Sequence, residues 1–199
     1  MNYISSASDK VYILLRQSLR AILLTAAALV SLSGLFSQVV LAESGDATVG
    51  SFEEKIAPFD ELLTVDGALL EESPAVGNGR WKLVMIWATD CPICKQQKPV
   101  ISAFHDAHKD KDAEVFGIAL DGRQGLVAVN KYLQKHTVSF PNYVGEFSTV
   151  AVNYQELTEE DLRGTPTYLL FNPEGELKGN NPGPISVDAI EAFIARHSS

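Results

Sequence analysis

The sequence predicts a layered α/β domain in which helices flank a mixed central β-sheet, with a short β-rich extension before it. Two apolar runs of strand length, residues 83–88 and 114–120, are each followed by a segment with helical periodicity. A third run, residues 165–171, leads through a turn sequence into a short edge strand and a closing helix. This order of elements is typical of a sheet with helices packed on its faces.

Residues 1–42 predict a signal peptide or an N-terminal membrane anchor. Lys10, Arg16 and Arg20 precede an uncharged apolar run, residues 21–42, which ends in small and branched residues as a signal cleavage site does. An uncleaved anchor is the alternative, because a helix of this length would reach about 33 Å and a bilayer core is about 30 Å thick. In both cases the basic flank stays inside, so we expect a periplasmic or other extracytoplasmic protein, either free or anchored to the inner membrane.

Residues 43–79 are predicted to form an N-terminal extension of the main domain, which covers residues 80–199. Asp66 and Gly67 form a turn pair between apolar residues, which favours a hairpin in this extension. The Gly-Asn-Gly sequence at residues 77–79 then predicts a loop before the first central strand.

The main domain is predicted as alternating strands and helices. The continuous apolar character of residues 83–88 suits a central strand that is covered on both faces. Helical spacing begins at Pro92, and Pro99 should kink this helix because proline lacks the backbone donor and clashes with the preceding turn. The other expected elements are strands at 114–120, 140–144, 165–171 and 176–179, and helices at 126–136, in part of 150–162, and at 187–197.

The charge balance disfavours nucleic acid as a partner. The chain of 199 residues has 25 acidic and 16 basic residues, a formal net charge of -9. An acidic protein repels a phosphate backbone, so we expect no nucleic-acid partner.

The only two cysteines, Cys91 and Cys94, lie where the first central strand changes into a helix. A bridge that closes so short a loop gives little stability, so the pair indicates a redox-active site or part of a metal site. Cys91 lies at the helix start, where free N–H groups and the helix dipole favour a thiolate, and Pro92 fits the first helical turn. We therefore predict that Cys91 is the attacking sulfur and that Cys94, one turn further on and more buried, is the resolving sulfur.

Three neighbours, Asp90, Lys95 and Gln97, are expected to tune this pair. Asp90 places negative charge beside a developing Cys91 thiolate and should disfavour it, and no cation stands between the cysteines. Lys95 would act in the opposite direction if its side chain turned back. We expect a reductant rather than a strong oxidant.

Metal binding and inert thiols are the alternatives for the cysteine pair. His105 and His108 complete a pattern that resembles a zinc site, but about 16 Å of continuous helix would separate Cys94 from His105. We therefore expect no metal in this site and place both histidines on a solvated helix face. A binding protein that holds Cu(I) with Cys91 and Cys94, without turnover, remains an alternative function.

Two segments carry a resemblance to a known family. Residues 87–95 (WATDCPICK) resemble the thioredoxin-like W-A-x-x-C-x-x-C-K signature, and residues 163–167 (RGTPT), before an apolar strand and an Asn-Pro-Glu-Gly turn, resemble the family's cis-proline strand. With the secretion segment and the short extension, the chain is similar to the TlpA/ResA/CcmG group of extracytoplasmic thiol–disulfide oxidoreductases. The resemblance implies a thioredoxin fold over roughly residues 59–199.

The resemblance also implies roles for individual residues. Cys91 would be the nucleophile and Cys94 the resolver, and Pro166 would be cis and lie against them. Thr165 would offer backbone groups to an extended substrate segment, and Trp87 would pack beside the site. The implied partners are a protein disulfide substrate and a membrane or periplasmic thiol donor. We expect a monomer without a cofactor.

The chain departs from the family pattern at three positions. Asp90 replaces the tryptophan that is common before the first cysteine, Met85 stands where cytoplasmic thioredoxins have a buried aspartate, and Gln97 stands where the TlpA/ResA group usually has a glutamate. Both acidic proton acceptors are missing, which leaves water, Lys95, Asp90 or a partner's residue to deprotonate Cys94. A peroxidase of the peroxiredoxin type is a third function, which the closely spaced resolving cysteine fits less well.

Overall fold

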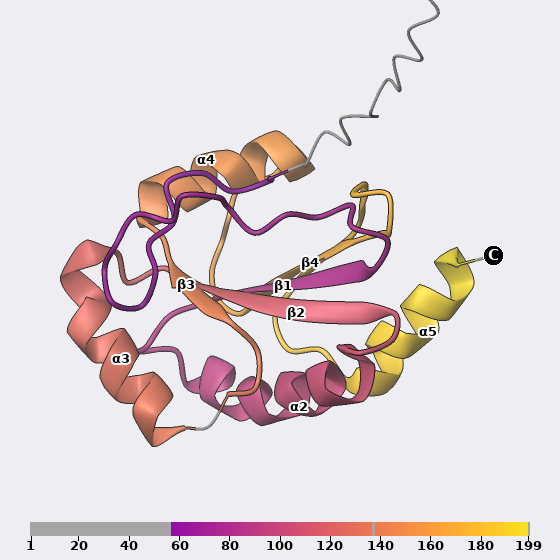
Figure 1. Ribbon diagram of the computed structural model, residues 1–199, viewed down its shortest axis with the longest axis horizontal. Helices are drawn as coiled ribbons and strands as arrows, with labels where there is room; N and C mark the ends of the chain where they lie inside the picture. Colours follow the sequence, from indigo (N-terminus) through magenta and orange to yellow (C-terminus); the bar gives the residue numbers. More distant parts are fainter. Residues whose placement is uncertain (1–56, 137, 199) are drawn as a thin grey trace, which may run out of the picture. The chain divides into compact units, whose positions relative to one another are not determined.

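The computed structural model describes residues 57–136 and 138–198 (Figure 1). The predicted signal or anchor, residues 1–42, and the first part of the extension, residues 43–56, lie outside this range. Among the helices of the described range, none is both long and apolar enough to cross a membrane.

Strands and helices alternate along the main domain as the sequence predicts. The strands are β1 (Trp81–Trp87), β2 (Ala113–Ala119), β3 (Asn142–Val144), β4 (Thr167–Phe171) and β5 (Leu177–Pro182). The helices are α2 (Pro92–His108), α3 (Leu126–Lys135), α4 (Phe147–Thr158) and α5 (Val187–His197), with a short 3-10 turn, η1 (Arg123–Gly125), before α3. Helix α2 runs through Pro99 without a break.

The five strands form one mixed sheet in the order β3-β2-β1-β4-β5. β1 pairs in parallel with β2, and β2 pairs in parallel with β3. β4 is antiparallel to both of its neighbours, β1 and β5. The central position of β1 explains the apolar run at residues 83–87, because both faces of the strand are covered.

Side chains alternate across β1 and divide the core into two layers. Trp81, Leu83, Met85 and Trp87 pack with residues of α2, α3 and α5 on one face. Val84 and Ile86 point to the other face, toward α4 and the extension. Figure 1 shows α2 and α4 on opposite sides of the sheet.

The predicted turn at Asp66 and Gly67 is present in the described part of the extension, residues 57–79. The segments around it form a narrow loop with isolated β-bridges instead of a regular hairpin. The Gly67 N–H donates to the Thr64 carbonyl, and Gly67 has a φ of 90°, a conformation that favours glycine. Leu63 bridges both Leu69 within the loop and Val144 of β3. Phe59 and Leu62 are buried against the α4 side of the sheet, so the extension completes one layer of the core.

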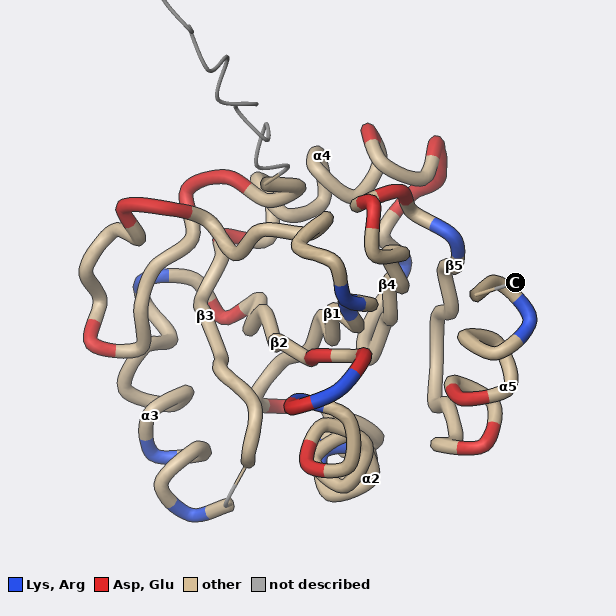
Figure 2. The backbone as a smooth tube through the Cα atoms, turned by 45° about the vertical axis from the view of Figure 1, so that its right-hand side comes forward, with Lys and Arg blue, Asp and Glu red and all other residues tan. Residues whose placement is uncertain are grey.

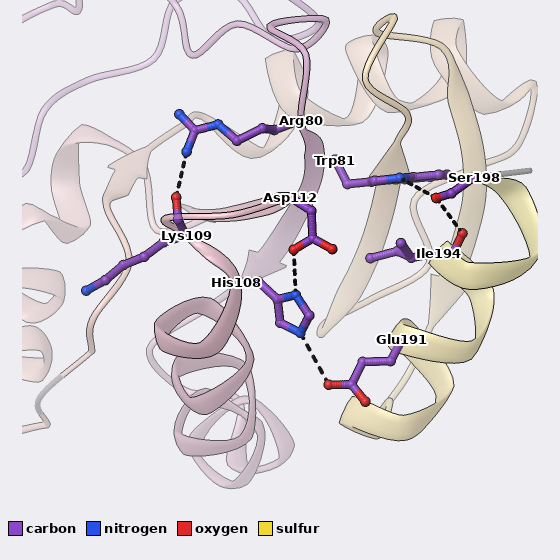
Figure 3. Close-up of polar contacts among 8 residues, drawn as sticks. All are labelled: Arg80, Trp81, His108, Lys109, Asp112, Glu191, Ile194 and Ser198. Atoms are coloured by element: carbon purple, nitrogen blue, oxygen red, sulfur yellow. Dashed lines mark hydrogen bonds and ion pairs between the residues drawn. The ribbon is translucent and has the colours of Figure 1, made fainter.

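The prediction for the α2 histidines is wrong. His105 is buried, its Nδ1 accepts a hydrogen bond from the Val115 N–H at 3.1 Å, and burial lowers its pKa. His108 is largely covered, and its ring nitrogens lie 2.8 Å and 3.2 Å from carboxylate oxygens of Asp112 and Glu191 (Figure 3). The buried face of α2 extends to its last turn because α5 packs there.

Three further contacts tie the chain around the end of α2, as Figure 3 shows. The Arg80 guanidinium donates to the Lys109 carbonyl, and the Trp81 indole N–H donates to the Ser198 hydroxyl at 3.2 Å. The Ser198 hydroxyl in turn donates to the Ile194 carbonyl at 2.8 Å.

Burial alone would lower the pKa of His108. Its hydrogen bonds with the carboxylates of Asp112 and Glu191 outweigh burial and raise the pKa.

Charge is unevenly spread over the described backbone. Figure 2 shows acidic positions gathered on the extension and on the loop after α4, whereas Lys and Arg are distributed singly along the chain.

Candidate functional site

Cys91 and Cys94 form a disulfide at the junction of β1 and α2, with their Cα atoms 5.3 Å apart. Cys91 is the N-cap residue of α2, with extended backbone angles, and its Sγ accepts from the Cys94 N–H at 3.1 Å. Pro92 occupies the first turn, where its missing N–H leaves no bond unmade. The local sequence thus holds one sulfur at the positive end of a helix, as predicted.

The two sulfurs differ in accessibility. Cys91 keeps 8% of its surface exposed, whereas Cys94 keeps 1%. Cys91 is less exposed than an attacking sulfur was expected to be, although it is the more accessible of the two. Ile93, between them, is 43% exposed and offers an apolar contact beside the disulfide.

The segment before β4 meets the disulfide from the other side. The Thr165–Pro166 peptide bond is cis, as the resemblance implied. The Thr165 carbonyl oxygen lies 3.4 Å from the Cys91 sulfur, although the two residues are 74 positions apart in sequence. The antiparallel pairing of β1 with β4 brings them together, because it sets the start of β4 beside the end of β1.

Trp87 lies beneath the disulfide and is completely buried. Its indole N–H donates to Asn142 Oδ1 of β3 at 3.0 Å, and its ring packs on Tyr132 of α3 with centroids 5.2 Å apart. Gly117 leaves room for this pair, because a Cβ there would lie 2.3 Å from Asn142 Oδ1. Trp87 therefore supports the site from the core.

The three predicted tuning residues occupy different surroundings. Asp90 and Lys95 are exposed. Gln97 is half-buried, and its Oε1 accepts from the Tyr168 hydroxyl at 3.0 Å and from the Ile185 N–H at 2.8 Å. Gln97 thus connects α2 to β4 and to the segment before α5.

Lys98 is a site residue that the sequence analysis missed. It is 2% exposed, and its Nζ lies 3.2 Å from the centroid of the Trp87 ring. Burial lowers the pKa of Lys98 to about 7, although the negative charge of Asp121 raises it in part. The signal was present, because Lys98 follows Cys94 by four residues and so shares its face of the helix.

Asp121, which directly follows the strand predicted at residues 114–120, is a second missed residue. Its carboxylate accepts from the Thr89 N–H at 3.1 Å and from the Thr89 hydroxyl. These bonds hold the segment between β1 and Cys91 against the end of β2. The sequence did contain a signal for this residue. An aspartate directly follows one buried strand, and the neighbouring buried strand leads to the cysteines.

The zinc alternative does not match this geometry. His105 and His108 bond elsewhere, as described above, and no group of three or more His, Cys, Asp or Glu side chains gathers in metal-binding range within residues 57–136 and 138–198.

A cysteine disulfide at a helix start, faced by a cis-proline segment, defines the class of thioredoxin-fold proteins with a redox-active cysteine pair. The chain belongs to the AhpC/TSA family, whose model matches residues 54–179. This membership confirms the predicted thioredoxin-like assignment and the predicted fold.

Relatives and solved structures agree with this assignment. The thiol-disulfide oxidoreductase ResA of Halalkalibacterium halodurans is 23% identical over 180 residues, which cover 90% of this chain and 92% of that relative. The sporulation thiol-disulfide oxidoreductase A of Bacillus subtilis is 22% identical over 133 residues, 66% of this chain and 75% of that relative. A thiol:disulfide interchange protein from Chlorobium tepidum matches in structure with a TM-score of 0.58 and 20% identity, over 70% of this chain and 95% of that one. The predicted enzyme class, thiol–disulfide oxidoreductase, is thereby confirmed.

Proposed function

We propose that this protein is an extracytoplasmic reductant of protein disulfides that acts through Cys91 and Cys94. The observation that carries the proposal is the position of the Cys91 sulfur, 3.4 Å from the Thr165 carbonyl beside the cis Pro166. A reacting sulfur next to the main chain of Thr165 suits an extended peptide that brings its own disulfide to the site.

The reaction begins from the reduced dithiol. The Cys91 thiolate attacks one sulfur of the partner's disulfide, a Cys91–partner bond forms, and the partner's other sulfur leaves as a thiolate that takes up a proton. Cys94 then loses its proton and attacks the Cys91 sulfur, which closes the Cys91–Cys94 disulfide and releases the second partner sulfur as a thiolate. The partner gains two electrons and the protein loses two.

The substrate is proposed to lie along the segment before β4. Thr165 is part-buried, and its carbonyl faces Cys91, so a peptide backbone near Cys91 meets main-chain rather than charged groups. Ile93 adds an exposed apolar contact on the other side. This surface favours an extended segment of varied sequence, as strand addition does.

The proposed direction of electron transfer and the proposed location rest on the sequence. The exposed Asp90 beside Cys91, without a cation between the cysteines, opposes the thiolate and favours a reducing couple. The basic residues followed by an apolar run at residues 1–42 favour export, and a membrane or periplasmic thiol donor would restore the dithiol.

Stoichiometric transfer to a test peptide with one internal disulfide tests the proposed reaction. The reduced protein should become oxidised as an equal amount of peptide becomes reduced, which mass spectrometry of alkylated samples can follow. The Cys91→Ser, Cys94→Ser double variant is the control and should leave the peptide unchanged. Persistence of both reduced protein and oxidised peptide would contradict the proposal, and oxidation by hydrogen peroxide far faster than by peptide would favour a peroxidase.

A further inference from the structure

The resolving step needs a proton acceptor, and the sites where one was expected do not provide it. Cys94 faces the core, whereas Asp90 and Lys95 are exposed at the surface. Met85 is buried and apolar. Gln97 is neutral, and its oxygen already accepts two hydrogen bonds. An acceptor that this chain itself supplies to Cys94 would therefore lie within the buried layer.

Lys98 brings an amine into that layer. It lies on α2 four residues after Cys94, where side chains are neighbours about 5–6 Å apart at Cβ. Because helix side chains lean toward the helix start, the stem of Lys98 is expected to lean toward the turn that holds Cys94. Both residues belong to the side of the core that contains Trp87.

Aromatic rings and one amide oxygen surround the Lys98 nitrogen, and no carboxylate of the described residues forms an ion pair with it. Its Nζ lies 3.2, 5.4 and 5.5 Å from the ring centroids of Trp87, Tyr132 and Phe140. Asn142 Oδ1, at 3.4 Å, is its one hydrogen-bond acceptor among the side chains of the described residues. No carboxylate of the described residues lies in ion-pair range of Lys98.

An amine in these surroundings can exchange a proton near neutral pH. Aromatic faces compensate only part of the cost of burying an ammonium. Burial accordingly lowers the pKa of Lys98 to about 7, and a mixture of amine and ammonium results at neutral pH. The titratable groups nearest to it are Cys94 one turn earlier on its own helix, Asp121 after β2 and Tyr132 on α3, and the His136 ring packs on Tyr132 at a tilt.

We propose that the neutral Lys98 amine accepts the proton of the Cys94 thiol when Cys94 resolves the mixed disulfide. This inference rests on the proposed exchange function. The proton moves from the Cys94 sulfur to the Lys98 nitrogen, the Cys94–Cys91 bond forms, and the Cys91–partner bond breaks. The leaving partner thiolate then takes a proton, which the Lys98 ammonium can return, so that charge and protons balance.

Ellman's reagent separates the two steps of exchange. Reduced Cys91 attacks this small aromatic disulfide and releases one coloured thiolate, and resolution by Cys94 releases the second. In the wild type, the rate of the second release should rise through about pH 7, following the amine fraction of Lys98. Lys98→Met should slow the second release about tenfold or more below pH 8 and leave the first within about twofold, consistent with the loss of a general base.

Two further variants keep the result interpretable. Lys98→Arg preserves a positive charge but cannot accept a proton, so it should remain slow; fast resolution in this variant would overturn proton acceptance in favour of a fixed charge. Lys82→Met removes another buried lysine, which lies at the end of β1 away from the cysteines. This variant should release the second thiolate at the wild-type rate. The inference would be overturned if Lys98→Met released the second thiolate at the wild-type rate and with the wild-type pH profile. Absence of both phases in the wild type would instead overturn the exchange function.

Discussion

Replacing Cys94 with serine is expected to convert exchange with turnover into a stable covalent complex through Cys91. The first step needs only the Cys91 thiolate, so the mixed disulfide should still form. Its resolution then depends on external thiols at millimolar concentration, whereas a thiolate held in place can act at an effective concentration on the order of 10⁵ M. The release of partner should slow by at least about 1000-fold, and non-reducing electrophoresis with mass spectrometry should show the complex.

Cys91→Ser is the matched control for this trap. Its remaining sulfur, Cys94, is 1% exposed, so a partner disulfide should not reach it and no complex should accumulate. A complex that formed equally well through Cys94 would reverse the assigned roles of the two sulfurs.

Trp87→Ala is expected to cause the largest loss of stability among single substitutions near the site. The indole is completely buried, packs on Tyr132, and donates to Asn142, and its face covers the Lys98 nitrogen. Removal of a buried tryptophan typically costs about 3–5 kcal/mol. Urea unfolding of the oxidised protein should show this decrease in the free energy of unfolding.

Phe147→Ala is the control for Trp87→Ala, because Phe147 is 56% exposed at the start of α4. Its unfolding free energy should stay within about 0.5 kcal/mol of the wild-type value. A Trp87→Ala variant as stable as the Phe147→Ala variant would show that the indole does not support the site as described.

The sheet could be predicted from the sequence because its central strands carry a strong local signal. β1 and β2 are apolar runs that are each followed by a helical segment, and these two observed strands differ from the predicted ones by one or two residues at each end. The start of β4 differs more, since Thr165 and Pro166 precede the strand and form the cis bond instead. That bond was expected from the resemblance and not from local propensity, which gives cis only about 5–6% of X–Pro bonds.

The parts that were missed depend on contacts between distant residues. Lys98 looks like an ordinary polar position on a helix, and only the packing of α2 against Trp87 and β3 shows it to be buried. His105 was expected in solvent for the same reason, although the N–H of Val115 in β2 supplies its partner. Asp121 bonds to Thr89 across the ends of two strands, a pairing that no local pattern contains.

These contacts change the interpretation of an atypical site. The sequence suggested a dithiol deprived of acidic proton acceptors. The structure retains that feature, with Met85 apolar and Gln97 engaged, but adds a buried amine on the same helix as Cys94. The departures from the family pattern at Met85 and Gln97 are therefore accompanied by a different titratable group.

The equilibrium reduction potential of the Cys91–Cys94 pair tests most directly whether the protein is a reductant of protein disulfides. The fraction of oxidised protein can be measured by alkylation and mass spectrometry across defined ratios of reduced to oxidised glutathione at pH 7. We predict a potential more negative than about −220 mV, at or below the range of the glutathione pool. A potential above about −180 mV, toward the value near −120 mV of a strong disulfide oxidant, would contradict the reductant assignment.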